Sequence, residues 1–182
     1  YFREAFDDYN SLIDKKEEIT SILEYINGLY TVYTNILVFD KNGKVIAVSN
    51  KNNEYLIGKI LTQDWVEKTL ILRDTSKYCV SKFEKSALYN NESTYIYSSA
   101  IRSFKDEKII TGGIAVVFDS TPQFNAMLDE SLPRDIDGNK ISGIFALFTD
   151  KDKKIISSTN DNFQVDSYLN IDDKFFNLKN AQ

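Results

Sequence analysis

Residues 40–50 read DKNGKVIAVSN and residues 150–160 read DKDKKIISSTN, so one stretch occurs twice, 110 positions apart. Five of its eleven positions are identical in the two copies. Each copy follows a largely apolar run, at residues 35–39 and 144–148. Solenoid repeats recur every ~20–50 residues, which is a much shorter period. The duplication therefore predicts two copies of one domain-sized unit, the second of them incomplete.

The composition is that of a folded, mildly acidic protein. The 182 residues are 42% hydrophobic and include 11 Tyr and 12 Phe, enough for a sizeable core and too many for a disordered chain. The net charge of −5 argues against nucleic acid as a partner. The sequence has no run of 18 apolar residues and no signal peptide. Because it starts without Met inside a helical pattern, we expect a fragment whose flanking segments attach to a membrane.

Residue types needed for common catalytic sites are missing. There is no histidine, and Cys79 is the only cysteine, which excludes Ser-His-Asp and Cys-His nucleophiles, His-based zinc sites and an internal disulfide. Residues 135–139 resemble half of a calcium loop, but Ala146 stands where the bidentate Glu belongs. We therefore predict a protein that is not an enzyme and has neither a metal nor a cofactor.

Residues 1–33 carry a helical pattern. Their apolar residues recur at intervals of three and four, and the first glycine is Gly28. The pattern loses phase across the polar residues 14–18. One helix over this segment would reach roughly 45 Å at about 1.5 Å per residue, which suits a stalk or a dimer seam. The alternative is a helix folded back on its own domain, and both can hold. We assign residues 1–33 to a long stalk or dimerisation helix that forms a homodimer.

From residue 34 the pattern is typical of strands. Residues 36–39 and 44–48 flank a turn in which Asn42 and Gly43 tolerate positive φ. The next predicted elements are a short helix and three strands, at residues 62–72, 78–83, 94–101 and 109–118. The sequence Gly112-Gly113 lacks the helix start and the Lys of a phosphate loop, so we expect it to permit a close backbone approach. This order predicts an α+β fold with a central antiparallel sheet.

Residues 121–142 are predicted to form a helix and a polar connector. Pro122 occupies a first-turn position, and Pro133 ends the helix. Residues 143–182 repeat the opening hairpin, with Lys153 where the first copy has Gly43. A weak helix is predicted at residues 172–178.

The order of these stretches resembles the double Cache family, the tandem PAS-like extracytoplasmic sensor domains of bacterial chemoreceptors and sensor kinases. The matching words are VFDKNGKVI at 38–46, the Ile57-Gly58 turn, YSSAIR at 97–102, GIAVVFD at 113–119 and IISST at 155–159. The resemblance implies a long N-terminal helix followed by two Cache modules with central antiparallel sheets. It implies a membrane-distal module at 34–120, a partial membrane-proximal module at 143–182, and a ligand bound within roughly residues 55–119.

The resemblance also implies site residues. The amino-acid-binding branch of the family has an Arg-x-Trp-Tyr word after the Ile-Gly turn and a later Asp for the ligand's amine. This chain reads Gln63-Asp64-Trp65-Val66 there, and Asp119 ends its last strand. The Trp and the Asp are kept, whereas Gln63 and Val66 replace the Arg and the Tyr. Arginine suits bidentate carboxylate binding, and glutamine offers only neutral donors.

Alternation along the strands adds further candidates. Tyr95, Tyr97 and Ser99 share one face of a strand, which is either a polar pocket wall or a solvated sheet face. Tyr78 and Ser81 lie on opposite faces by alternation, and we select Tyr78. The predicted ligand-binding set is Gln63, Asp64, Trp65, Tyr78, Tyr95, Tyr97, Ser99 and Asp119.

Three of these positions also have structural interpretations. Trp65 either stacks on a ligand or fills the core. Asp119 either receives a cationic group or caps the helix that follows it. Arg102 either recognises an anion or is an exposed residue at a strand end.

We therefore predict the extracytoplasmic sensing domain of a transmembrane chemoreceptor, a methyl-accepting chemotaxis protein, on the periplasmic side of a bacterial membrane. Its ligand is an amino acid, an amine or an organic acid. The alternatives are the input domain of a sensor histidine kinase or of a cyclic-dinucleotide enzyme, and a structural dimerisation module without a ligand.

Overall fold

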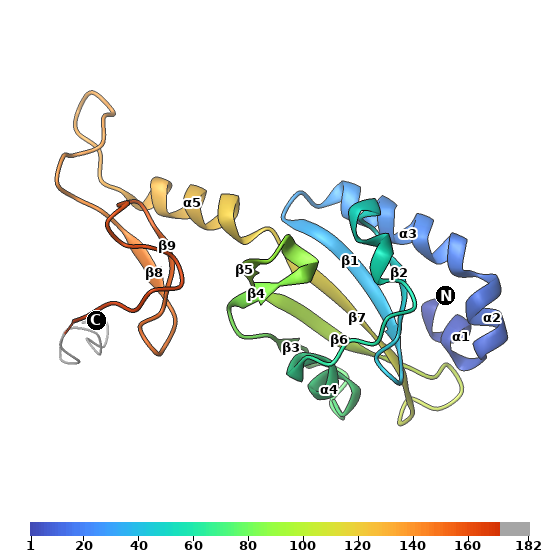
Figure 1. The fold of residues 1–182 in the computed structure, drawn as a ribbon. Helices are drawn as coiled ribbons and strands as arrows, with labels where there is room; N and C mark the ends of the chain where they lie inside the picture. The colour runs from blue at the N-terminus through green and yellow to red at the C-terminus, as the bar shows by residue number, and fades with distance from the viewer. Residues whose placement is uncertain (172–182) are drawn as a thin grey trace. The chain divides into compact units, whose positions relative to one another are not determined.

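The computed structural model describes residues 1–171, and their contacts divide the chain into two compact units, residues 1–120 and residues 121–182 (Figure 1). The first unit is built on a five-stranded sheet with the strand order β2-β1-β7-β6-β3, and every pairing in it is antiparallel. The strands are β1 (Tyr33–Asp40), β2 (Val45–Val48), β3 (Cys79–Val80), β6 (Ile96–Arg102) and β7 (Ile110–Phe118). The predicted antiparallel sheet is confirmed.

The prediction of one continuous helix over residues 1–33 is wrong. The segment forms three helices: α1 (Phe2–Asp7), α2 (Tyr9–Asp14) and α3 (Lys16–Leu29). The first break is at Asp8, which has extended backbone and whose carboxylate accepts the N–H of Asn10 at 3.2 Å. The second break is at Lys15, inside the polar run where the apolar pattern loses phase. Asp8 thus acts as an N-cap, a role for which Asp is favoured.

These helices fold back on their own domain. Phe6, Leu12, Ile19 and Leu23 are buried in one cluster with the strand residues Ile36 and Val38. Burial of this apolar stripe fixes α1–α3 on one face of the sheet, because that face would otherwise be exposed to water. The helical pattern is therefore explained by packing within the unit.

The opposite face carries a second apolar cluster, in which Leu37 and Phe39 alternate with the residues of the first. It is covered by α4 (Asp64–Leu70), by the 3₁₀ helices η1 (Lys51–Leu56) and η2 (Ala87–Tyr89), and by the ribbon β4 (Glu84–Ser86) and β5 (Glu92–Thr94). Trp65 of α4 is only 2% exposed, and its ring meets that of Phe39 edge-on, with centroids 5.8 Å apart. The core on this face is thus centred on two aromatic side chains.

Gly112 and Gly113 let β7 pass close to its neighbours, as expected from the sequence. A Cβ atom on Gly113 would lie 2.3 Å from Cζ of Phe39, and one on Gly112 would lie 2.3 Å from the carbonyl oxygen of Phe39. Real Cβ atoms do not approach other heavy atoms this closely. The ring of Phe39 therefore occupies the space that a side chain at position 113 would need.

The second unit begins within α5 (Ser120–Ser131), at residue 121. It also contains a hairpin of β8 (Leu147–Thr149) and β9 (Ile155–Ser158). This hairpin reproduces β1–β2 with an offset of 110 residues. Leu37 pairs with Val48 as Leu147 pairs with Ser158, and the register shifts at the equivalent place in both. The repeated sequence therefore encodes a repeated structure. The predicted helix at residues 172–178 lies outside the described residues.

The same turn closes both hairpins. In each, the aspartate carboxylate accepts the N–H groups two and four residues further on, at 2.8 and 3.0 Å for Asp40 and at 2.8 and 2.9 Å for Asp150. Gly43 has a φ of +76°, and Lys153, its counterpart, adopts +65°. The turn thus needs the aspartate and tolerates a non-glycine residue in the left-handed region.

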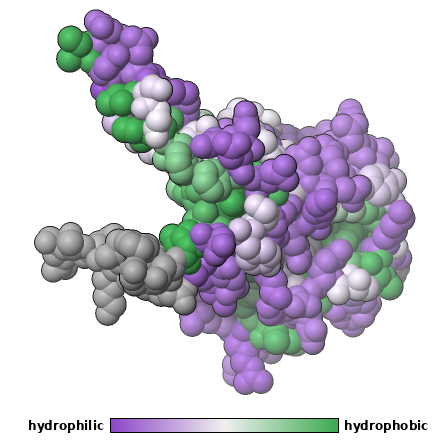
Figure 2. Space-filling model, turned by 60° about the vertical axis from the view of Figure 1, so that its left-hand side comes forward, coloured by the Kyte–Doolittle hydropathy of each residue, from purple (hydrophilic) through white to green (hydrophobic). Residues whose placement is uncertain are grey.

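Within residues 1–171, no helix combines the length and the apolar character needed to cross a bilayer. Figure 2 shows hydrophilic side chains over most of the visible face of the first unit. A mainly polar surface agrees with the charged composition of the chain.

We predict that Gly113→Ala lowers the free energy of unfolding by ~1–3 kcal/mol, because the new methyl group displaces the Phe39 ring. The matched control is Gly28→Ala in α3, where an added Cβ meets nothing within 4 Å. That substitution should stabilise the protein by up to about 1 kcal/mol. Urea unfolding of both variants measures the difference, and equal effects of the two substitutions would contradict this account.

Candidate functional site

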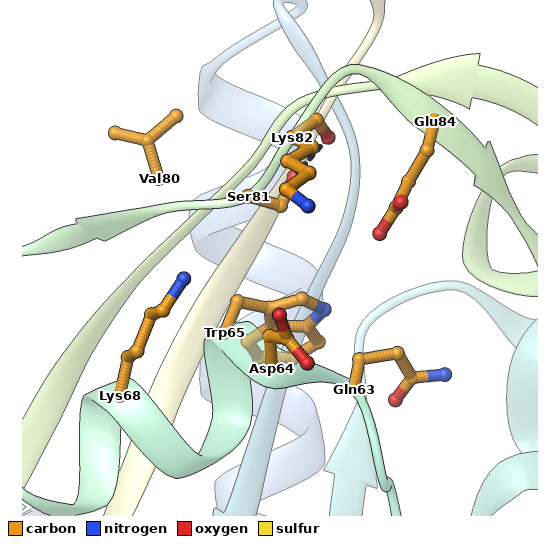
Figure 3. A pocket seen from close by; sticks show the side chains of 8 residues that line it. All are labelled: Gln63, Asp64, Trp65, Lys68, Val80, Ser81, Lys82 and Glu84. Atoms are coloured by element: carbon orange, nitrogen blue, oxygen red, sulfur yellow. Dashed lines mark hydrogen bonds between the residues drawn. The ribbon is translucent and has the colours of Figure 1, made fainter.

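A cavity of about 160 Å³ lies beside the first turn of α4 (Figure 3). Three of the predicted residues line it together: Gln63, Asp64 and Trp65. The other lining residues come from α4 and from the segment that follows β3: Lys68, Val80, Ser81, Lys82 and Glu84. Ligand pockets for drug-sized molecules measure about 300–1,000 Å³, so this cavity suits a smaller molecule.

Trp65 lines the cavity while it is part of the core, so both interpretations made from the sequence apply to it. Its position is fixed from two sides. The Phe39 ring packs against it, and the hydroxyl of Thr69 donates to its carbonyl oxygen at 2.7 Å. The same Thr69 hydroxyl lies 2.6 Å from the hydroxyl of Ser98 on β6, which ties α4 to the sheet. The wall that Trp65 provides is therefore rigid.

Charges of both signs surround the opening. In Figure 3, Asp64 and Lys68 extend from α4, and Lys82 and Glu84 extend toward them from the opposite segment. All four residues are exposed, and within residues 1–171 none of them forms an ion pair. The site can therefore offer an ammonium group and a carboxylate to a ligand without first breaking a salt bridge.

Three predicted residues lie on the other face of the sheet. Tyr97 and Ser99 do share a face, but they stand opposite Val116 and Ile114, which pack against the helix-covered cluster. The Tyr97 ring contacts that of Tyr78 at 6.2 Å, and burial raises the pKa of Tyr97. Tyr78, Tyr97 and Ser99 are therefore separated from Trp65 by the sheet. Strand alternation predicted which residues share a face of the sheet, but it could not predict on which side of the sheet the cavity lies.

Ser81 lines the cavity, although we selected Tyr78 over it. Tyr78 is 65% exposed, while the Ser81 hydroxyl accepts the N–H of Ile96 at 2.9 Å. Tyr95, also predicted, does not line the cavity, and its ring packs against that of Phe83 at 5.2 Å.

Sequence reasoning missed the lysines and Glu84, although spacing pointed to them. Lys68 lies one helical turn after Asp64, and residues three or four apart share a helix face. Lys82 and Glu84 are two apart, which places them on one side of an extended segment. The sequence does not show that α4 and residues 80–84 face each other across the cavity.

Asp119 also lies apart from the cavity. Its carboxylate accepts the hydroxyl of Tyr89 at 2.7 Å, and Tyr89 is 7% exposed. Helix α5 starts at Ser120, directly after it. Asp119 therefore joins Tyr89, in the core of the first unit, to the start of α5. Its role toward a ligand stays a prediction.

Arg102 is buried rather than exposed, with 9% of its surface accessible. Its guanidinium donates to the carbonyl oxygens of Leu72 and Glu107. It joins the loop after α4 to the β6–β7 turn. Within residues 1–171, no three carboxylate or cysteine side chains come close enough to hold a metal ion.

The fold has relatives among solved sensor domains. The ligand-binding domain of the Campylobacter jejuni chemoreceptor Tlp3, in complex with 4-methylisoleucine, superposes with a TM-score of 0.61 at 22% identity, over 87% of this chain and 55% of that one. The sensor domain of the Vibrio cholerae histidine kinase DctB gives 0.56 at 18% identity, over 82% and 50%. An extracellular ligand-binding receptor from Desulfohalobium retbaense gives 0.63 at 14% identity, over 82% and 25%.

The chain thus spans about a quarter to just over half the length of these structures, and at such identities they show the fold alone. No curated protein matches the chain. The family model described as the Cache domain of the WalK sensor protein kinase matches residues 18–117, more than half of the chain. The chain therefore belongs to the Cache family of extracytoplasmic sensor domains, which is found in chemoreceptors and histidine kinases.

Proposed function

We propose that this chain is the ligand-sensing domain of a membrane-anchored chemoreceptor and that its ligand binds in the cavity beside Trp65. The observation that carries the proposal is the set of exposed charges of both signs around that cavity, none of which forms an ion pair within residues 1–171. Cache domains of this kind are generally non-enzymatic input domains, so the site needs only to bind. The Tlp3 structures contain amino acids or close analogues, which supports a small-molecule ligand here.

The ligand that fits these charges best is a small zwitterion, such as an amino acid. One lysine and one carboxylate stand on each side of the cavity, so a ligand that carries both charges can bridge α4 and residues 80–84. Gln63 offers an amide in place of the arginine of the amino-acid-binding branch. Lys68 and Lys82 then supply the positive charge for a carboxylate.

Binding acts by population shift. A ligand that contacts both walls favours the arrangement in which residues 80–84 lie close to α4. Residues 34–120 would be the membrane-distal module and residues 143–182 the start of a membrane-proximal one, in which the β8–β9 hairpin repeats the first. Flanking segments would carry the shift to the membrane.

A sensor histidine kinase is the second candidate for the whole receptor, because the matching family model is named after a sensor kinase. The ligand site is the same in both proposals. The output domain encoded by the complete gene distinguishes them.

We predict that a zwitterionic amino acid raises the melting temperature of the protein more than the matching amine or carboxylic acid does. Lys82→Gln should weaken binding by about two- to five-fold, because one exposed charge pair contributes up to ~1 kcal/mol. Thermal-shift screening followed by calorimetric titration measures both effects. Trp65→Ala is a poor test, since truncating a core aromatic costs ~3–5 kcal/mol of stability.

The matched control for Lys82→Gln is Lys85→Gln, an exposed lysine on the same segment that does not line the cavity. It should leave the affinity unchanged. If no compound stabilises the protein, or if the two variants bind alike, the proposed site is wrong.

We also propose that the protein dimerises through its N-terminal segment. Tyr25 and Leu29 lie one turn apart on α3 and are 69% and 60% exposed, so a second copy would bury them. Sedimentation velocity should show a dimer that Leu29→Glu converts to a monomer. Met127→Glu, at an equally apolar exposed position on α5, should leave the dimer intact. A monomeric wild-type protein would contradict this proposal.

A further inference from the structure

We propose that a second cavity in the first unit binds a small organic cation with an apolar body. The cavity measures about 320 Å³ and shares no lining residue with the one beside Trp65. It is lined by residues of α1, α2, the β1–β2 turn and the start of β7, which meet at one end of the sheet (Figure 1). Its volume falls in the range of about 300–1,000 Å³ that small-molecule sites occupy.

The walls of this cavity are partly apolar. Phe6 and Leu12 come from the N-terminal helices, and Ile109 and Ile110 come from the sheet side. Ile109 is 54% exposed, although it lies next to the buried Phe6 and Leu12 in the lining. An apolar ligand body would cover Ile109 and remove that surface from water.

Asp7 provides the polar contact. Its Oδ2 atom accepts the N–H of Phe104 at 3.1 Å, whereas its Oδ1 atom is buried and has no donor among the described residues. A buried acceptor without a donor is unfavourable, and a cation held in the cavity beside the Asp7 carboxylate would offset its negative charge.

The charge balance selects a cation. Asp40, a second lining carboxylate, is 7% exposed, and its Oδ1 accepts two N–H groups of its own turn. Lys41 also lines the cavity, but it is an exposed residue whose ammonium group can extend into water. Arg3, on α1, is bonded to Glu107 and to two carbonyl oxygens. Within residues 1–171, Asp7 forms no ion pair.

The test is calorimetric titration of the full 182-residue chain with n-pentylammonium, with pentanoate as the charge-reversed control. The amine should bind saturably and pentanoate should not. Asp7→Asn keeps the shape of the side chain and should weaken binding at least about ten-fold, since it removes a charged acceptor. Glu67→Gln, which changes an exposed acid on α4 that lines neither cavity, should leave the affinity for the amine unchanged.

Ile109→Lys serves as a second variant, because Ile109 is exposed and its replacement spares the core. It should abolish binding of the amine by adding a positive charge at the cavity, with an unchanged circular dichroism spectrum. The proposal is overturned if the amine does not bind saturably or if pentanoate binds equally well. It is also overturned if either Asp7→Asn or Ile109→Lys binds the amine within two-fold of wild type.

Discussion

The contact between the Phe39 ring and Gly113 is the constraint on which the first unit depends. Because position 113 has no side chain, the ring of Phe39 packs over Gly113 of β7 and meets Trp65 edge-on. Trp65 in turn forms a wall of the cavity and anchors α4, from which Asp64 and Lys68 extend. Phe39, at the end of β1, therefore holds the candidate site in place, although it does not line the cavity.

The parts of the fold that could be predicted are those set by local chemistry. An aspartate that accepts two backbone N–H groups of its own turn, followed by a residue in the left-handed region, favours a tight turn, and apolar runs on both sides of it make a hairpin. The hairpins at Asp40 and Asp150 accordingly have the same pairing and the same register shift. Strand alternation predicted the shared face of Tyr97 and Ser99, and the two glycines of β7 predicted a close approach.

The parts that could not be predicted depend on which segments meet in three dimensions. Periodicity in residues 1–33 could not separate one long helix from three that turn at Asp8 and Lys15, since both bury the same stripe. Tyr97 was placed in the site although the sheet separates it from Trp65. The lysines at the cavity were missed because Lys68 and Lys82 meet only through the packing of α4 against the segment after β3.

The fluorescence of Trp65 tests the central claim, that the cavity beside it is the ligand site, most directly. It is the only tryptophan in the chain, so all tryptophan emission reports on this wall of the cavity. During titration with a compound that stabilises the protein, the account predicts a saturable change in emission with the same midpoint as the calorimetric titration. An emission spectrum that stays unchanged while the compound binds would show that the ligand binds elsewhere.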